Sequence, residues 1–131
     1  MKLKVGVLGK FELTVTREML AKSMSSGALE VFATPYMIAI MEAAAQDSIA
    51  ALVGEGNGTV GTKVEVEHLA PTPLGMHVSA ESELIEIDGR QLVFRVSAYD
   101  ACGKIGEGLH ERFIVNQEKF LEKCNAKLAS I

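Results

Sequence analysis

Three side chains in this sequence carry the functional groups that acyl hydrolysis needs: the hydroxyl of Thr34, the carboxylate of Glu42 and the imidazole of His68. An imidazole can accept a proton near neutral pH. A carboxylate can orient that imidazole or activate a water molecule, and a hydroxyl can act as a nucleophile or donate a hydrogen bond to the acyl group. Because these roles require the groups to meet, the elements that position them decide whether they act together.

Each of the three also has a structural interpretation. Thr34 precedes Pro35, an order typical of a helix N-cap followed by the first helical residue. Glu42 could form an ion pair with Arg112 or Lys63 instead of acting on a substrate. His68 ends a predicted strand, where a lone histidine often only supports the fold. The residue types alone leave both interpretations open.

Residues 35–53 form a predicted helix made largely of Met, Ile and Ala. Eight residues separate Thr34 from Glu42, which corresponds to about 80° of net rotation and about 12 Å of rise along an ideal helix. Both polar groups should therefore lie on one side of the helix, where a buried carboxylate needs a partner. Backbone amides at the helix start could stabilise an oxyanion.

The other segments predict a sheet. Alternating apolar and polar residues favour strands over 10–16 and 59–69, and then three more, ending with 104–115. Asp88–Gly89 is typical of a hairpin turn, and Asn116 can cap a terminal helix. We expect an α+β chain in which an antiparallel sheet wraps round one long helix, the arrangement called the hot-dog fold.

Chain length predicts the number of domains, and the edges of the sheet predict the oligomeric state. The 131 residues fit a single domain spanning 1–131. A single sheet leaves unpaired backbone groups on its edge strands, and pairing two copies edge to edge would satisfy them. We therefore expect a homodimer.

Composition narrows the functional class. The net charge is −4 and no long basic run occurs, which argues against a nucleic-acid partner. No segment approaches the roughly 20 apolar residues of a membrane span, and the first ten residues lack the features of a secretion signal. Cys102 and Cys124 form neither a disulfide framework nor a ligand cluster. We expect free thiols, a cytoplasmic location, and neither a metal ion nor a redox cofactor.

Several segments resemble the fluoroacetyl-CoA thioesterase family, and together they extend over roughly residues 30–127. The resemblance implies a hot-dog thioesterase with a Thr–Glu–His triad, which falls on Thr34, Glu42 and His68. It also implies that a glycine backbone and an arginine shape the acyl site, and these match Gly61 and Arg112. The matching segments are 31–42, 61–62, 67–75, 95–100, 106–112 and 118–120.

The sequence departs from the family pattern just before Thr34. The fluoroacetyl-specific enzyme has paired phenylalanines in a lid there, whereas residues 25–30 contain no aromatic side chain. That lid helps to exclude water and to select the fluorinated acyl group. The expected substrate is therefore the broader class of small acyl-CoA thioesters, without a specific preference for fluoroacetyl-CoA.

Two rival functions remain at this stage. A non-catalytic protein that binds acyl-CoA or another small ligand could keep the fold, although it would not need a carboxylate near an imidazole. A hot-dog hydratase would need an Asp/His pair, and Asp47 has no adjacent histidine.

Other polar residues have simpler interpretations. We expect His77 to be solvated, and His110 could line a pocket beside Arg112. We expect Cys124 to pack against its neighbours. The lysine row of the terminal helix reads as a solvated face that could also contact a CoA phosphate: Lys119, Lys123 and Lys127.

Overall fold

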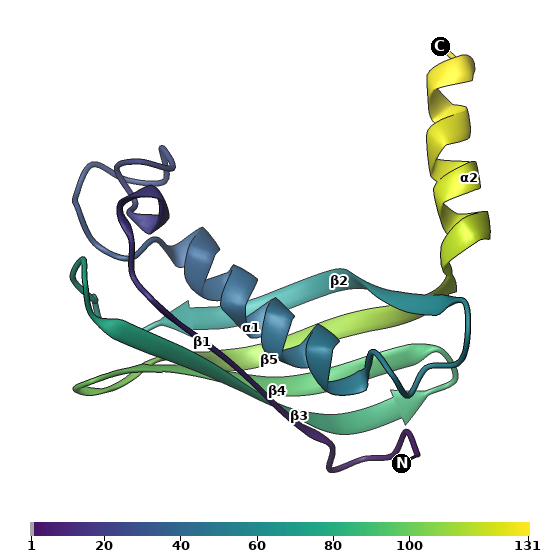
Figure 1. Ribbon diagram of the computed structural model, residues 1–131, viewed down its shortest axis with the longest axis horizontal. Helices are drawn as coiled ribbons and strands as arrows, with labels where there is room; N and C mark the ends of the chain where they lie inside the picture. Colours follow the sequence, from purple (N-terminus) through teal and green to yellow (C-terminus); the bar gives the residue numbers. More distant parts are fainter. Residues whose placement is uncertain (1) are drawn as a thin grey trace.

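The computed structural model describes residues 2–131, and its centre is a five-stranded antiparallel sheet with one long helix across a face (Figure 1). The strands lie in the order β1-β3-β4-β5-β2, so β1 and β2 are the edges. This is the hot-dog arrangement that the sequence predicted. The elements in chain order are β1 (Leu8–Thr14), the 3-10 helix η1 (Arg17–Met19), α1 (Thr34–Ile49), β2 (Asn57–His68), β3 (His77–Asp88), β4 (Gln91–Asp100), β5 (Gly103–Asn116) and α2 (Gln117–Ala129).

The core lies between α1 and the inner face of the sheet. Alternate residues of the adjacent interior strands β3 and β4 are buried there, as the alternation in the sequence predicted. Met37, Ile40, Met41, Ala44 and Ala45 cover them from α1. The helix packs mainly against β1 and β3, so the inner face near β2 is less well covered.

The start of α1 differs by one residue from the expected one. The N-cap is Ala33, whose carbonyl accepts from the backbone amides of Tyr36 and Met37. Thr34 is the first helical residue and makes no capping hydrogen bond, so its hydroxyl is free for another partner. Pro35 still lies in the first turn, where its missing N–H has no acceptor to lose. The helix ends at Ile49, before the expected residue 53.

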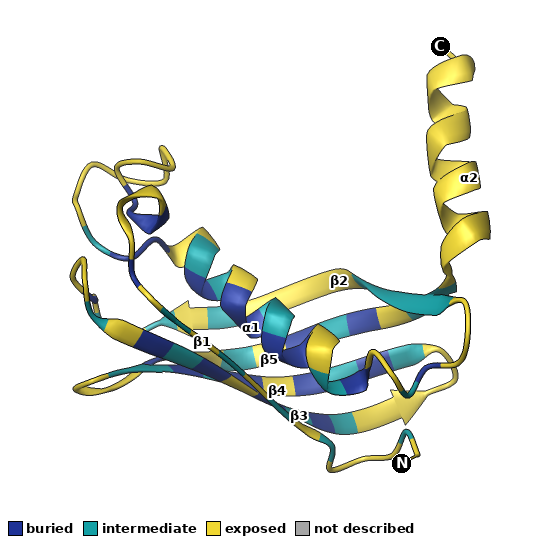
Figure 2. Ribbon diagram, viewed as in Figure 1, coloured by how far each residue is buried: buried dark blue, intermediate teal, exposed yellow. Residues whose placement is uncertain are grey.

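The terminal helix α2 projects away from the sheet (Figure 1). Asn116 caps it as expected, accepting a 3.0 Å hydrogen bond from the amide of Lys119. None of its residues is buried, and Figure 2 shows it exposed along its whole length. Phe120, Leu121 and Leu128 are exposed, and so is Cys124, which the sequence led us to place in a packed position.

Candidate active site

Thr34 and His68 meet where the start of α1 faces the end of β2. Their side chains form a 2.7 Å hydrogen bond between Thr34 Oγ1 and His68 Nδ1. Thr34 is exposed and His68 is half-buried, so the pair lies at the surface with the imidazole partly enclosed. This Thr34–His68 pair joins two of the three residues that the sequence singled out.

The enclosed side of His68 disfavours a charged imidazolium. Its Nε2 atom is buried, and no group in residues 2–131 makes a well-formed hydrogen bond to it. Burial lowers the pKa of His68, and the nearby backbone of Ala70 partly opposes this effect. Burial therefore favours the neutral imidazole of His68, the state that can accept a proton.

A hollow of about 310 Å³ opens directly beside the Thr34–His68 pair. Its walls come from the segment before α1 and from the residues that follow β2. They are mostly aliphatic or small, and the one aromatic ring, Phe32, is buried and packs near Tyr36 at 6.0 Å between ring centroids. The walls include Ala21, Ser26, Val31, Phe32, Leu69 and Pro71.

Glu42 lies in a second group of residues, farther along α1. Its Oε2 atom is 3.6 Å from Arg112 Nη1 and would lie 2.7 Å from a Cβ atom added to Gly61. Only a glycine at position 61 leaves room for the carboxylate in this place. Gly61, Arg112 and Glu42, with the buried His110 beside them, form what we call the Glu42–Arg112 cluster.

Arg112 is held firmly within this cluster. Its Nε donates to Thr59 Oγ1 at 2.8 Å, and its Nη2 donates to the Thr59 carbonyl at 3.1 Å. The side chain is 8% exposed, whereas that of Glu42 is 40% exposed. Burial lowers the pKa of Arg112 and Glu42 opposes this, but a guanidinium remains charged in proteins. The cluster therefore presents a fixed cation and a solvent-accessible carboxylate.

Within one chain, the Thr34–His68 pair and the Glu42–Arg112 cluster are separate. Thr34 and Glu42 are about 12 Å apart along the axis of α1. On β2, the stretch from Gly61 to His68 extends about 20 Å. The ion pair with Arg112 is the structural alternative that the sequence left open for Glu42.

A β-bulge places both groups on the same face of β2. Gly61 and His68 are an odd number of residues apart, so a regular strand would point them to opposite faces. The pairing register shifts between Gly61 and Lys63, so Thr62 is an extra residue without its own partner. As a result Gly61 faces Arg112 and His68 faces Gly106, both on the inner face of β5.

Comparisons with known proteins identify the family of this chain. The sequence profile of the family described as "Fluoroacetyl-CoA-specific thioesterase" matches residues 15–118. A fluoroacetyl-CoA thioesterase from Streptantibioticus cattleyicolor is 43% identical over 98 residues, covering 75% of this chain and 70% of that protein. The chain belongs to this family.

Solved structures of the fluoroacetyl-CoA-specific thioesterase family superpose closely on the chain. A structure of the fluoroacetyl-CoA thioesterase FlK has a TM-score of 0.91 at 34% identity, covering 97% of this chain and 98% of that one. A phenylalanine-to-alanine variant of FlK in complex with fluoroacetate and CoA has a TM-score of 0.85 at 35% identity, covering 90% and 99%.

The other candidate residues from the sequence lie outside both the Thr34–His68 pair and the Glu42–Arg112 cluster. His77 is exposed and contacts Glu12 at 3.1 Å. Lys119, Lys123 and Lys127 lie on the exposed helix α2. In residues 2–131 no group of three or more His, Cys, Asp or Glu residues could hold a metal ion, and no helix there is long and apolar enough to cross a membrane.

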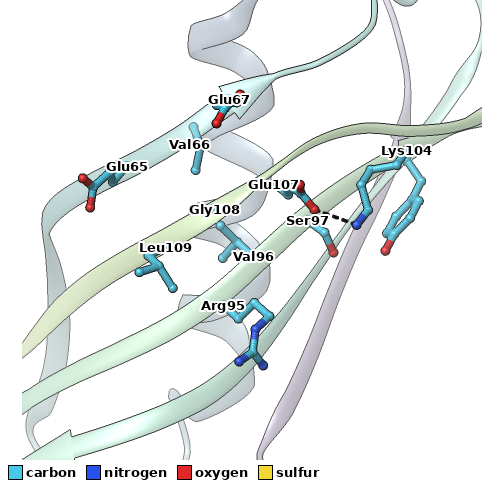
Figure 3. A pocket seen from close by; sticks show the side chains of 11 residues that line it. Glu65, Val66, Glu67, Arg95, Val96, Ser97, Lys104, Glu107, Gly108 and Leu109 are labelled. Carbon is cyan, nitrogen blue, oxygen red and sulfur yellow. Dashed lines mark hydrogen bonds and ion pairs between the residues drawn. The ribbon is translucent and has the colours of Figure 1, made fainter.

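Another hollow, of about 520 Å³, lies on the outer face of the sheet (Figure 3). Charged side chains of both signs surround it, including Glu65, Arg95 and the Lys104–Glu107 ion pair. Its lining has no histidine, so it has no counterpart of the His68 imidazole.

His110 is the site residue whose importance the sequence showed least clearly. It is 1% exposed and lies two residues before Arg112, on the same face of β5. That spacing was visible in the sequence and suggested a residue lining a pocket. The hydrogen bond of His110 to the Lys63 carbonyl lies beside the β2 bulge, which the sequence did not reveal, whereas Arg112 is two residues away on the same strand as His110.

Proposed function

We propose that the protein hydrolyses a small acyl-CoA thioester to the free acid and CoA. The observation that carries the proposal is the 2.7 Å contact between Thr34 Oγ1 and His68 Nδ1 beside the 310 Å³ hollow. Membership of the fluoroacetyl-CoA-specific thioesterase family supports the same reaction. The FlK variant bound to fluoroacetate and CoA supports this substrate class.

His68 acts as the general base. In its neutral form with Nδ1 unprotonated, the Thr34 hydroxyl donates to Nδ1, which can take the proton as an oxygen attacks the thioester carbonyl. The attacking oxygen belongs either to Thr34, giving an acyl-enzyme that water later hydrolyses, or to a water molecule in the same position. In both routes the C–S bond breaks, CoA leaves as a thiolate that takes up a proton, and one water is consumed.

Glu42, the third residue of the proposed Thr34–Glu42–His68 site, is supplied by a second copy of the chain. Because about 12 Å separates it from Thr34 along one helix, the carboxylate of the same chain is poorly placed to act on the Thr34–His68 pair. β2 is an edge strand whose outer side has no partner strand in residues 2–131. A homodimer formed through β2 would place the Glu42–Arg112 cluster of one protomer near the Thr34–His68 pair of its partner.

The pairing register of the two β2 strands determines which residues of the two protomers meet. If the two β2 strands pair antiparallel about the middle of residues 61–68, His68 of one protomer lies opposite Gly61 of the partner subunit. The two-fold axis then passes between Val64 and Glu65. Each dimer would contain two sites, and each site would use residues of both chains. Glu42 and Arg112 would orient the acyl group or the attacking water there, while the backbone of Gly61 leaves space for the acyl group.

The walls of the hollow suggest which acyl groups fit. Residues 25–30 provide no aromatic side chain, and the lining is mostly small or aliphatic. Short or branched aliphatic acyl groups should therefore be accepted as readily as fluoroacetyl. We also propose a cytoplasmic location, because exposed free thiols such as Cys102 persist in a reducing compartment.

The test is free-thiol release from a panel of fluoroacetyl-, acetyl-, branched and aromatic acyl-CoAs. Wild-type protein should turn over at least one of them, and His68→Ala and Glu42→Ala should each lower kcat by about 100-fold or more. Circular dichroism of both variants controls for loss of fold. A wild type that is no faster than both variants on every acyl-CoA would refute the enzyme and favour a protein that only binds acyl-CoA.

A further inference from the structure

His110 occupies a buried position between three strands. It lies on β5 opposite Val64 of β2 and Phe94 of β4, and its ring packs over that of Phe94 with 6.2 Å between centroids. Among residues 2–131, two polar contacts reach its ring. Its Nδ1 atom is 2.8 Å from the carbonyl oxygen of Lys63, and its Nε2 atom is 3.1 Å from Nη1 of Arg112.

These two partners determine where the proton of His110 resides. A carbonyl oxygen can only accept a hydrogen bond, so Nδ1 must carry a hydrogen. A guanidinium can only donate, so Nε2 must be unprotonated and accept. A second proton would break the bond to Arg112 and place two cations in contact. Burial lowers the pKa of His110, and although the Lys63 carbonyl opposes this, Arg112 adds to it.

The neutral imidazole completes the support of Arg112. Thr59 accepts from Nε and from Nη2, and His110 accepts from Nη1. All three nitrogens of the guanidinium are therefore anchored. Nη1 is also the nitrogen that lies 3.6 Å from the Glu42 carboxylate. Without His110, the nitrogen that faces Glu42 would have no anchor of its own.

The bulge in β2 accounts for the contact between the His110 ring and the Lys63 carbonyl. Carbonyl groups of a regular strand lie near the plane of the sheet, whereas the carbonyl of Lys63 accepts from a side chain on the inner face. The extra residue Thr62 allows this tilt, and its hydroxyl donates to the Glu111 carbonyl at 3.2 Å.

We propose that His110 is a positioning residue: as a neutral imidazole with its proton on Nδ1, it aims the guanidinium of Arg112 at the catalytic carboxylate of Glu42. The part of this proposal that concerns catalysis rests on the proposed function. The contact between His110 and Arg112 stands on the geometry alone. The other charged groups around His110 are Glu111 on its own strand, Lys63 on β2 and Glu42 on α1.

Two amide substitutions separate the halves of this arrangement. In His110→Gln, the side-chain oxygen can occupy the position of Nε2 and accept from Arg112, but the bond to Lys63 is lost. In His110→Asn, the shorter amide can donate to the Lys63 carbonyl, but it cannot reach Arg112. Each variant loses one buried hydrogen bond, so each serves as the stability control for the other.

The proposal predicts different kinetics for two variants of similar stability. His110→Asn should have a kcat at least tenfold below that of His110→Gln, because small displacements of catalytic groups cost up to about 100-fold in rate. The KM values should agree within about threefold. Adding Arg112→Ala to His110→Asn should lower kcat no further than Arg112→Ala alone, because His110 acts through Arg112. Equal kcat values, or effects that multiply in the double variant, would overturn the proposal.

A measurement without substrate tests the contact itself. In the 15N-labelled wild-type protein, His110 should show a protonated Nδ1 and an unprotonated Nε2 whose chemical shift changes on Arg112→Ala. A proton on Nε2 would overturn the positioning contact, whatever the activity. If the contact is found but the wild type hydrolyses no acyl-CoA of the panel, the proposed function fails, and with it only the catalytic purpose of the contact.

Discussion

A dimer assembled from one His68→Ala chain and one Glu42→Gln chain should recover about half of the wild-type activity, although each variant alone is nearly inactive. The reason is the separation between the two half-sites. Glu42 Oε2 lies against Gly61, and from there to His68 is about 20 Å along β2. If each site combines residues of both chains, the mixed dimer has one site with both lesions and one site with none.

The reciprocal mixed dimer provides the control. Wild-type chain paired with a chain that carries both substitutions should be nearly inactive, because each of its two sites then contains one lesion. If instead each chain forms a complete site, the outcome reverses: this dimer keeps half of the activity and the first mixed dimer has almost none.

The assay requires dimers of defined composition. The two chains are co-expressed with different affinity tags, purified on both tags in succession, and compared at equal protein concentration by free-thiol release. Light scattering confirms the mass of two chains. A strictly monomeric wild type, or activity in the reciprocal mixed dimer only, would refute the shared site.

Three further predictions follow from the same geometry. First, because burial lowers the pKa of His68, the acid limb of kcat/KM should lie below the ordinary histidine value of about 6.5, and a limb above 6.5 would contradict its role as base. Second, Gly61→Ala should displace the Glu42 carboxylate, since the new Cβ would lie 2.7 Å from Oε2. We expect at least a tenfold loss of kcat/KM. If the unfolding free energy also changed by more than about 0.5 kcal/mol, the loss would instead point to damage to the fold. Third, burial lowers the pKa values of His68 and His110, so just below pH ~6.5 the unfolded chain binds more protons than the folded one. The contribution of the two neutral histidines to the unfolding free energy, measured in urea, should therefore be greatest above that pH and should decrease as the pH falls. The decrease should be smaller in His110→Gln.

The sequence predicted the elements well where one periodicity dominates. The buried faces of β3 and β4 and the cap at Asn116 are where the residue pattern placed them. The start of α1 was predicted one residue too late, at a Thr34 cap instead of an Ala33 cap, because either residue can precede a first turn that contains proline. Here the carbonyl of Ala33 accepts the first helical hydrogen bonds, and the hydroxyl of Thr34 turns to His68 instead.

The candidate site was predictable only in part. The sequence indicated Thr34, Glu42 and His68 together, and the structure brings Thr34 and His68 into contact. The position of Glu42 could not follow from helical spacing alone, because its contact with Arg112 depends on the sheet pairing that brings Gly61 opposite Arg112. A bulge leaves no regular pattern in one sequence, since it interrupts the very alternation by which strands are recognised.

The extra residue Thr62 also has a consequence for how this protein can vary in length. Because Thr62 has no partner in the ladder, deleting it would leave every other β2–β5 pair in register. The carbonyl of Lys63 would then return toward the plane of the sheet and no longer reach the ring of His110. We therefore expect gain or loss of one residue here to be inherited together with the identity of residue 110. Relatives that are one residue shorter at this point should not have histidine there.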